Sequence, residues 1–473
     1  MYTLADLPFE NPYHALPERM FTRVAPDPLH APRLRHVNTA LADRLSIDST
    51  NTDDWAAFIN GDEAWGDPIA MKYMGHQFGH FNPDLGDGRG LLMGQYRDAN
   101  QKLWDFHVKG AGQTPYSRFG DGRAVLRSSI REYCMSAYFK ALNIPTTEAL
   151  ALVTSSETAL RETEEPTALV VRVADTHVRF GHFEYLGFTQ DFDGFDQLLD
   201  YTRREHFPET QSVAEWFHAV TQATATMVAH WQALGFCHGV MNTDNMSITG
   251  HTFDFGPYAL MDWFDPHYIC NLTDQGGRYA YHAQPKIALW NCYVLRCAVV
   301  ARHPELADEL DASLRTFQKD LDQHYQTFMQ QKLWGHAQHA GKSEDGAALA
   351  QSTLQLLSTH RLDYSRFFIG LTLEDWDIAL QHIKGSAEAN AWVADYQAMG
   401  TPNIQVMETI NPMAILHNST LQTVIEAANT DNWQPFEQLI TAIQSPFTWN
   451  DITRPYAQLP NTSACNGQLS CSS

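Results

Sequence analysis

Short apolar runs bounded by turn-forming residues dominate the first part of the chain, and this pattern is typical of β-strands. Leu91–Tyr96 and Leu103–Val108 flank the polar segment Arg97–Asn100, which predicts a strand–turn–strand hairpin. Ala168–Val173 and His177–Phe183 are two further apolar runs, and we expect both to be strands. Residues 1–70 are mixed in character and rich in proline, and we expect them to wrap the domain that follows.

Apolar residues recur at steps of three and four elsewhere, which predicts amphipathic helices. Ala124–Leu142 and Ser212–Leu234 have this spacing, and Lys286–Val300 has it with a proline just before its first turn. Beyond residue 300 nearly all of the chain has a helical pattern. The helices predicted there are Glu305–Trp334, Ala347–Thr359, Leu373–Ile383, Ala387–Met399 and Trp433–Ser445. The pattern therefore predicts an α+β protein in which strands precede an extended helical part.

Length and charge narrow the possible partners. The chain has 473 residues, of which 44% are hydrophobic, and this is enough for two lobes with large cores. Its 32 basic and 55 acidic residues give a formal net charge of −23. So acidic a surface repels nucleic-acid backbones and anionic membranes, and we expect neither as a partner. A phosphate ligand must then be held by a local cluster of basic groups or by a metal.

The cysteines and the N-terminus indicate the compartment. Seven cysteines are scattered without a Cys-x-x-Cys pair, so neither a zinc ribbon nor a dense disulfide framework is indicated. The N-terminal residues MYTLADLPFENPYHAL lack a basic region followed by an apolar run, which is unlike a secretory signal. No apolar run approaches membrane-spanning length. We expect a soluble, cytoplasmic protein.

Candidate chemistry is densest between Phe236 and Gly256. Asp244 and Asn245 are adjacent, and Asp254 follows in the tripeptide Asp-Phe-Gly. A carboxylate and an amide oxygen suit Mg²⁺ or Mn²⁺ and leave coordination positions open for phosphate oxygens. Asp244 would then be a spare carboxylate, free to accept a proton.

The segments between these residues predict how they meet. Met246–Ile248 and Thr252–Phe253 are expected to be two short strands joined by the turn Thr249–His251. Such a hairpin would bring Asn245 and Asp254 within reach of one ion. The alternative is a buried hairpin whose polar residues serve only its turns.

The order of these residues is that of a protein-kinase active site, with one departure. A kinase has His-Arg-Asp, then Asn, and then Asp-Phe-Gly. When His238 and Asn245 are aligned with that loop, Val240 falls where the kinase has its base. Valine cannot accept a proton, so the metal ligands remain while the usual base is missing. Asp244 is the replacement candidate.

A glycine-rich segment precedes the predicted hairpin. Gly86, Gly88 and Arg89 lie in DLGDGRG, where alternate glycines let backbone N–H groups approach phosphates. An ordinary turn is the alternative. Lys109 ends the second strand of the hairpin, where a kinase keeps its phosphate-pairing lysine, and Glu132 lies in the following helix. Either residue alone could equally be a solvated surface charge.

Further basic and glycine residues extend this set. Asp121 and Gly122 precede a predicted helix, so the segment could present free N–H groups to phosphate, or Asp121 could be only an N-cap. Arg172 and Arg179 fall on the two predicted strands near residues 168–183. They could converge on one anion, as the guanidinium fork allows, or form surface salt bridges between the strands.

Several long motifs, in this order, resemble the selenoprotein O family, whose bacterial members are called YdiU. They are MGHQFGHFNPDLGDGRG, KGAGQTPYSRFGDGRAVLRSSIREY, HGVMNTDNMSI with DFGP, YHAQPKIALWN and the terminal Cys-Ser-Ser. The resemblance implies a protein-kinase-like two-lobe fold that transfers AMP from ATP, or UMP from UTP, to Ser, Thr or Tyr hydroxyls of proteins. The acceptor protein could also be the enzyme itself. The expected parts are an N-terminal extension (1–70), an N-lobe (71–190), a mostly helical C-lobe (191–460) and a tail (461–473).

The resemblance also assigns roles to individual residues. Asp244 corresponds to the proton acceptor, Asn245 and Asp254 to ligands of Mg²⁺ or Mn²⁺, and Glu132 to the partner of Lys109. The nucleotide contacts it implies are Gly86, Gly88, Arg89, Lys109, Asp121, Gly122, Arg172, Arg179 and Asp254.

The tail adds a redox hypothesis. In some family members the position of Cys471 holds selenocysteine, and Cys270 lies on the segment 269–281, which corresponds to a kinase activation segment. A Cys270–Cys471 disulfide could hold the tail across this segment and control activity. The alternative is a pair of free, inert thiols, because disulfides are rare in the cytosol.

Two other function classes remain open. One is an ordinary kinase that uses Asp244 as a displaced base, and the other is a non-catalytic nucleotide-binding scaffold. Val240 and the paired arginines disfavour the first, and the complete metal pair disfavours the second.

Overall fold

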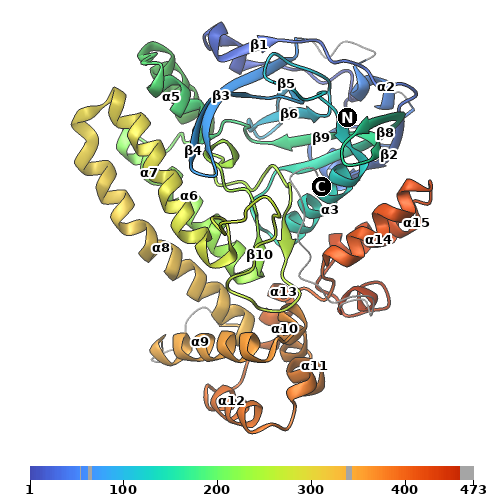
Figure 1. The fold of residues 1–473 in the computed structure, drawn as a ribbon, viewed down its shortest axis with the longest axis vertical. Coiled ribbons are helices and arrows are strands. Elements are labelled where there is room, and N and C mark those ends of the chain that lie inside the picture. Colours follow the sequence, from blue (N-terminus) through green and yellow to red (C-terminus); the bar gives the residue numbers. More distant parts are fainter. Residues whose placement is uncertain (54, 62–66, 337–342, 459–473) are drawn as a thin grey trace.

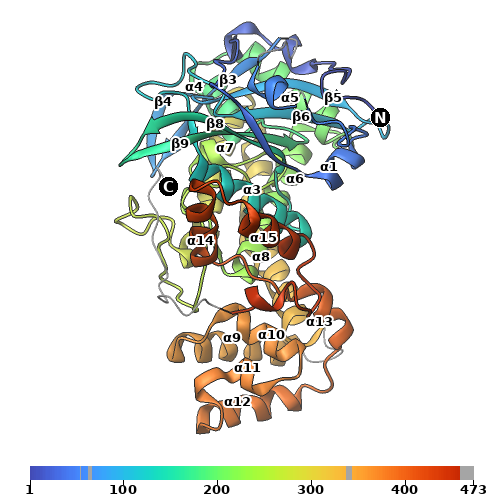
Figure 2. The same ribbon diagram turned by 90° about the vertical axis from the view of Figure 1, so that its right-hand side faces the viewer.

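The computed structural model describes residues 1–53, 55–61, 67–336 and 343–458. It is an α+β protein with a large antiparallel sheet at one end and helices over the rest (Figure 1). Three long helices run together along one side. A group of shorter helices forms the end opposite the sheet, and the last two helices lie beside the helix under the sheet (Figures 1 and 2).

The strands fall mainly in the first part of the chain, as the apolar pattern predicts. Their bounds are β1 Phe21–Arg23, β2 Arg33–Val37, β3 Ile69–Gln77, β4 His80–Gly86, β5 Gly90–Arg97, β6 Leu103–Lys109, β7 Ala124–Val125, β8 Glu148–Leu160, β9 Glu164–Ala174, β10 Phe236–Cys237 and β11 Ala259–Leu260. Within the described residues, nine strands form one sheet in the order β1-β3-β5-β6-β9-β8-β2, with β4 paired to β3 and β7 to β9.

The helices fill the remainder. Their bounds are α1 Thr39–Arg44, α2 Trp55–Asn60, α3 Leu126–Ala141, α4 Phe180–Phe188, α5 Phe192–His206, α6 Val213–Leu234, α7 Gln284–Arg302, α8 Ala307–Trp334, α9 Ser343–His360, α10 Tyr364–Thr372, α11 Trp376–Leu380, α12 Ala387–Ala398, α13 Ile404–Ile410, α14 Asn418–Asn429 and α15 Gln434–Gln444. Among the described residues, no helix is long and apolar enough to cross a membrane.

Both faces of the central sheet are covered, which explains why its inner strands are continuous apolar runs. Val171 and Val173 of β9 join a core with the N-terminal segment, which supplies Trp55 and Phe58. Val170, which points to the opposite face, joins the main core under the sheet. The sheet is therefore held between the N-terminal segment and α3.

The predicted hairpin between residues 91 and 108 is confirmed. Strands β5 and β6 pair antiparallel from Gly90 with Lys109 to Arg97 with Leu103. Residues 1–70 contribute more than a wrapping: β1 pairs with β3, and β2 pairs with β8 at the other edge. Strand β3 itself begins at Ile69 and so crosses the predicted boundary at residue 70.

Most predicted helices are confirmed, and one shows why. Ser212 caps α6 by accepting a hydrogen bond from the backbone N–H of Glu215 at 3.1 Å, and Gly235 ends the helix with φ 76°. Helices α10, α13 and α14 and strands β3, β4 and β8 were not predicted. The apolar periodicity of these segments is interrupted or continues into neighbouring loops. Tertiary contacts therefore decide their secondary structure.

The predicted strand His177–Phe183 is wrong. Phe180–Phe188 forms helix α4, and Arg179 occupies the position just before its first turn. Because α4 is buried on most sides, its residues show no polar face, and a short buried helix cannot be told from a buried strand by periodicity. The helix lies directly on β3: a Cβ at Gly181 would lie 2.1 Å from the carbonyl oxygen of Met74.

The predicted hairpin between Met246 and Phe253 is also wrong, although its turn exists. Ser247 pairs with Arg179, and Thr252 pairs with Thr146. The two segments thus bond to separate parts of the chain instead of to each other. Each segment forms a single bridge to a residue far away in the sequence, which local sequence does not reveal.

The helical end of the molecule buries a lysine. Lys332 of α8 is 6% exposed, and its Nζ lies 4.2 Å from the ring centre of Phe368 and 5.1 Å from that of Tyr364. Within the described residues no acidic side chain forms an ion pair with it. Burial lowers the pKa of its ammonium group to about 7.

We predict that Lys332→Met stabilises this protein. In the wild type the unfolded chain holds a proton that the folded chain lacks between pH 7 and about 10.4. Stability should therefore rise with pH in that window, by up to ~1.4 kcal/mol per pH unit. Denaturant titrations at several pH values in this range should give a higher free energy of unfolding for Lys332→Met. They should also show that this free energy changes less steeply with pH in the variant than in the wild type. Lys384→Met, at an exposed lysine, should match the wild type, and an unchanged slope in Lys332→Met would contradict the prediction.

Candidate active site

A cavity of about 800 Å³ opens between the sheet and the helical part. It is bounded by β3, β4, the end of β6, the loop before α3, and the segment 240–257. Glu132 and Arg172 are buried behind it and contact residues of its wall. The sequence-predicted residues that line it directly are Gly86, Gly88, Arg89, Lys109, Asp121, Gly122, Arg179, Asp244, Asn245 and Asp254.

Glu132 joins two buried cations at the back of the cavity. Its Oε2 accepts hydrogen bonds from Lys109 Nζ at 2.5 Å and from Arg172 at 3.0 Å, and its Oε1 bonds Arg172 Nε. Burial alone would raise the pKa of Glu132, but Arg172 and Lys109 lower it to about 2. Burial lowers the pKa of Lys109 to about 8, although Glu132 opposes this. The predicted pairing of Lys109 with Glu132 is therefore present.

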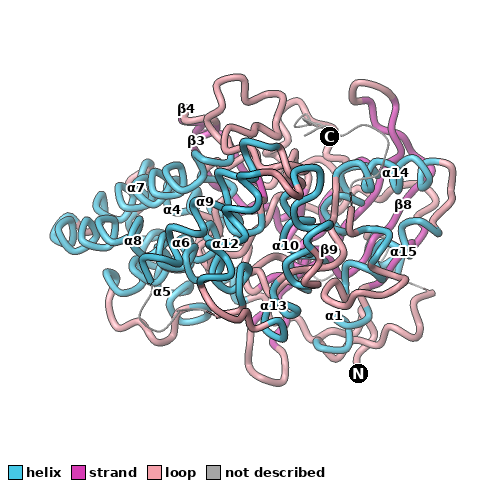
Figure 3. The backbone as a smooth tube through the Cα atoms, turned by 90° about the horizontal axis from the view of Figure 1, so that it is seen from below, coloured by secondary structure: helices cyan, strands magenta, loops and turns pink. Residues whose placement is uncertain are grey.

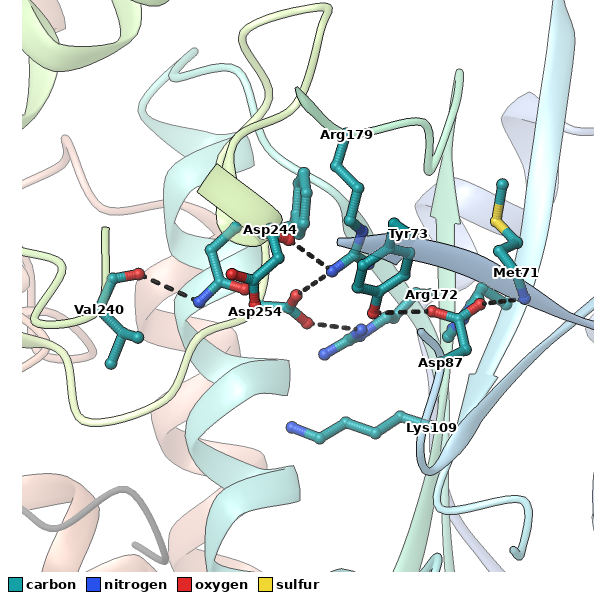
Figure 4. A network of polar contacts seen from close by, with 12 residues as sticks. Met71, Tyr73, Asp87, Lys109, Arg172, Arg179, Val240, Asp244 and Asp254 are labelled. Atoms are coloured by element: carbon teal, nitrogen blue, oxygen red, sulfur yellow. Dashed lines mark hydrogen bonds and ion pairs between the residues drawn. The ribbon is translucent and has the colours of Figure 1, made fainter. Parts of the chain in front are cut away.

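Asp254 receives the two predicted anion-binding arginines. Arg172 lies 2.9 Å from its Oδ1, and Arg179 lies 2.7 Å from its Oδ2 (Figure 4). Burial opposes ionisation, yet the arginines hold the pKa of Asp254 well below its usual range. The backbone of Asp254 has φ 56°, a left-handed conformation that aspartate adopts more readily than most residues. The two arginines meet at the carboxylate of Asp254, and their binding of a phosphate stays a prediction.

Arg179 links both halves of the cavity. Besides binding Asp254, its Nη1 donates a hydrogen bond to the backbone oxygen of Asp244 at 2.8 Å. Its guanidinium lies between two rings, 4.6 Å from the centres of both Tyr73 and Phe253. Strand β3 and the segment around Asp244 thus meet through one buried cation (Figure 4).

Asp244 is a buried carboxylate without an ion-pair partner among the described residues. It is 7% exposed, and its Oδ1 has no hydrogen-bond partner in the described part of the chain. Gln77 Nε2 lies 3.4 Å from its Oδ2. Burial raises the pKa of Asp244 to about 6, and Arg179 partly offsets this. A carboxylate with a pKa near neutrality can exchange protons at physiological pH.

The position of Asp244 depends on a close approach by β3. A Cβ at Gly75 would lie 2.6 Å from Asp244 Oδ1. Only glycine therefore fits at this point of the strand while the carboxylate keeps its place.

Asn245 and Asp254 fit a divalent metal by the chemistry of their donors. Asn245 Nδ2 donates to the backbone oxygen of Val240 at 3.1 Å, which leaves the amide oxygen for a ligand. Both residues line the same cavity. An amide oxygen and a carboxylate are a partial set for Mg²⁺ or Mn²⁺, which take their other ligands from phosphate and water. No group of three or more His, Cys, Asp or Glu side chains gathers as a metal site in the described residues.

The glycine segment between β4 and β5 is shaped by its neighbour Tyr116. A Cβ at Gly86 would lie 2.4 Å from the Tyr116 ring, and one at Gly88 would lie 3.0 Å from the Tyr116 backbone oxygen. Arg89, which follows, is exposed at the cavity, and no acidic side chain of the described residues forms an ion pair with it. Arg89 is therefore free to meet an anion.

Asp121 is held by a residue that sequence reasoning missed. Arg161 bonds both of its carboxylate oxygens, at 2.7 and 3.0 Å, and donates to the backbone oxygen of Arg123 at 2.9 Å. This fastens the tip of the β8–β9 hairpin to the loop that carries Asp121 and Gly122. The sequence offered no signal, because Arg161 is separated from that loop by α3 and β8.

Tyr73 and Asp87 are further wall residues that were not predicted. Tyr73 donates to Asp87 Oδ1 at 3.2 Å, and Asp87 Oδ2 accepts from the backbone N–H of Met71 at 3.1 Å and lies 3.3 Å from His107 Nε2 (Figure 4). Burial would raise the pKa of Asp87, but His107 lowers it to about 2. Asp87 lies inside the glycine motif between Gly86 and Gly88, so the motif itself could have suggested it.

Cys270 is fully buried, at 0% exposure, and its sulfur lies 3.4 Å from the backbone oxygen of Cys237. Burial raises the pKa of its thiol well above the usual value, which disfavours the reactive thiolate. Cys471 lies outside the described residues, so the Cys270–Cys471 pair stays a prediction.

Sequence comparison identifies relatives over nearly the whole chain. Residues 3–444 match the family described as protein adenylyltransferase SelO. The protein nucleotidyltransferase YdiU of Aeromonas hydrophila is 43% identical over 467 residues, covering 95% of this chain and 96% of that protein. Proteins of the same name from Vibrio cholerae (40% over 483 residues, 98% of each chain) and Hydrogenovibrio crunogenus (42% over 487 residues, 98% and 100%) are similar. The chain therefore belongs to the SelO family.

Proposed function

We propose that this protein transfers AMP from ATP to Ser, Thr or Tyr hydroxyls of proteins and releases pyrophosphate, and that its two lobes form a protein-kinase-like fold. UTP as donor of UMP, and self-modification, belong to the same proposal. The observation that carries it is Asp244, a buried carboxylate of raised pKa in a cavity that Lys109, Arg89 and Arg179 also line. The names of the relatives, which describe nucleotidyl transfer and proteins, support this reaction class.

The kinase-like part of the proposal rests on a few matched positions. A strand lysine, Lys109, is paired with a helix glutamate, Glu132, and Asp254 lies in an Asp-Phe-Gly segment at the cavity. Val240 lines the cavity at the position of the kinase base. These positions support a kinase-like arrangement of cations and metal ligands in which Asp244, next to Asn245, is the candidate base.

In the reaction, Asp244 would accept the proton of the acceptor hydroxyl. The hydroxyl oxygen forms a bond to the α-phosphorus, the bond between the α-phosphorus and the bridging oxygen breaks, and pyrophosphate leaves with the electron pair. Lys109, Arg172 and Arg179 would hold the phosphates and neutralise the charge that develops on them. Arg89, exposed at the cavity, is a further phosphate contact.

A divalent metal, Mg²⁺ or Mn²⁺, would be held by Asn245 and Asp254 and would supply charge neutralisation at the phosphates. Asp254 is bound to Arg172 and Arg179 when no ligand is present. Phosphates that pair with these arginines would free the oxygens of Asp254 for the metal. Nucleotide and metal should therefore bind cooperatively.

The experiment that tests the function uses ATP labelled at either the α- or the γ-phosphate. We expect the purified protein, with Mg²⁺ or Mn²⁺, to place label on protein only from the α-phosphate. Label only from the γ-phosphate would identify a kinase with Asp244 as a displaced base. No label from either, despite nucleotide binding, would favour the non-catalytic scaffold.

A second prediction concerns Asp244. Asp244→Asn should lower the turnover number by roughly 10²–10⁴-fold, while the affinity for ATP stays close to wild type because the arginines are unchanged. Since a base must be deprotonated, wild-type activity should fall as the pH drops through about 6. A profile of kcat/KM against pH, which reports the free enzyme, checks this, and wild-type kcat in Asp244→Asn would exclude Asp244 as the base.

A third prediction separates the roles of Asp254. In EDTA, Asp254→Asn should bind ATP at least as tightly as wild type, because the competing carboxylate charge on Arg172 and Arg179 is removed. Added Mg²⁺ or Mn²⁺ should strengthen ATP binding in wild type but not in this variant, which should also lose most activity. Calorimetric titration measures both, with the exposed Asp451→Asn as control. Metal-dependent tightening in Asp254→Asn would contradict this assignment.

A further inference from the structure

An exposed aromatic patch lies beside the cavity. It consists of His76, Phe81, Phe188, Trp290 and Arg278, which touch in series. The ring centres of Phe188 and Phe81 are 4.7 Å apart, and His76 lies 5.2 Å from both Phe81 and Trp290. The Cζ of Arg278 lies 4.6 Å from the centre of the Trp290 ring. Phe188 is 62% exposed and Phe81 39%, so large apolar side chains face solvent here.

The patch is built on elements that meet near the sheet. His76 is on β3, Phe81 on β4, Phe188 at the end of α4 and Trp290 on α7, and Arg278 comes from the loop 269–281. Helix α4 packs on both β3 and α7, and the four elements lie together in Figure 3. The β3–β4 turn is also close to the loop, since a Cβ at Gly79 would lie 3.0 Å from Arg278 Cζ. The patch is therefore built on elements that pack against one another.

The patch is continuous with the segment that carries Asp244. The backbone N–H of His76 donates to Thr243 Oγ1 at 2.7 Å, and the next residue, Gln77, lies 3.4 Å from Asp244. Gln77 and Phe78 line the cavity. Because side chains alternate along a strand, His76 turns away from Asp244, with its Nδ1 2.7 Å from Glu184 Oε2, while Gln77 turns to Asp244. A chain lying on the patch would pass beside residues that line the cavity.

Arg278 gives the patch a charge preference. Its Nε is buried and has no hydrogen-bond partner in the described part of the chain. It also forms no ion pair there with an acidic side chain, in a protein with 55 acidic and only 32 basic residues. A guanidinium stacked on an indole and lacking a carboxylate suits an acidic group from another molecule.

We propose that this aromatic patch docks the acceptor polypeptide. An apolar side chain of the acceptor packs on Phe81 and Phe188, an acidic side chain near it pairs with Arg278, and the hydroxyl to be modified enters the cavity past Gln77 and Phe78. This deepens the proposed function and rests on it. It predicts acceptors with an apolar and an acidic residue close to the modified hydroxyl.

The first test uses dephosphorylated β-casein, an unfolded, acidic, hydroxyl-rich protein, as the acceptor with α-labelled ATP. Phe188→Ala and Phe81→Ala should each raise the KM for casein by at least ~5-fold, as loss of an interface anchor does. The dissociation constant for ATP should not change, because neither ring lines the cavity. Ile452→Ala, at an apolar residue of similar exposure (51%) outside the patch, should match the wild type.

The second test uses serine and tyrosine peptide libraries in which Glu, Lys, Phe or Ala is fixed at each flanking position in turn. Wild type should select Glu and Phe. Arg278→Glu should shift the charge preference from Glu to Lys, and Arg278→Gln should lose it without gaining the opposite one. A merely structural role of Arg278 would lower all labelling without changing this preference.

The outcomes separate the two proposals. The docking proposal would be overturned, and the transfer activity would stand, if Phe188→Ala and Phe81→Ala had the wild-type KM for casein. An unaltered charge preference in Arg278→Glu would have the same meaning. If wild type labels neither casein nor any peptide although it binds ATP, the proposed function fails, and docking of an acceptor fails with it.

Discussion

The site depends on a chain of buried charges that runs from Lys109 through Glu132 and Arg172 to Asp254 and Arg179. Under the proposed function these cations hold a triphosphate, but burying them unpaired would cost several kcal/mol each. Glu132 compensates the charges of Lys109 and Arg172 through buried ion pairs. Asp254 compensates the charges of Arg172 and Arg179, and under the proposed function a bound phosphate would take its place. Removing either carboxylate would leave uncompensated buried charge, an effect of about 3–5 kcal/mol in known cases.

This constraint explains how the surrounding elements are placed. Helix α3 must approach the sheet closely enough for Glu132 to reach β6 and β9, and α4 must begin at Arg179 so that its guanidinium lies between Tyr73 and Phe253. Strand β3 must pass Asp244 without a side chain, which it does at Gly75. The same strand then carries His76 into the patch, so the wall of the cavity and the proposed docking patch are two faces of one strand. Under the two proposals, this strand links the candidate base to acceptor recognition.

Most residues of the candidate site could be predicted from the sequence because they lie in local motifs. Lys109 at a strand end, Glu132 in a helix, and Asp244, Asn245 and Asp254 in one short segment are recognisable from type and spacing, and the structure brings them together at one cavity. Contacts between residues far apart in the chain could not be predicted. Arg161 binds Asp121 across forty positions of chain, and neither residue hints at the other. The predictions were also wrong at α4 and at the segment 246–253, where burial on most sides or bridges to remote residues replaced the local pattern.

The sequence by itself determined the class of the fold, the succession of strands and long helices, and the identities of the charged residues. Periodicity and residue chemistry are local properties, and they survive without coordinates. Only the tertiary structure decided which charges meet, that Asp254 occupies the two arginines, that Asp244 is buried without an ion pair among the described residues, and that five residues from four elements and a loop form one exposed patch. These depend on distances between segments far apart in the chain, and such distances are set by packing.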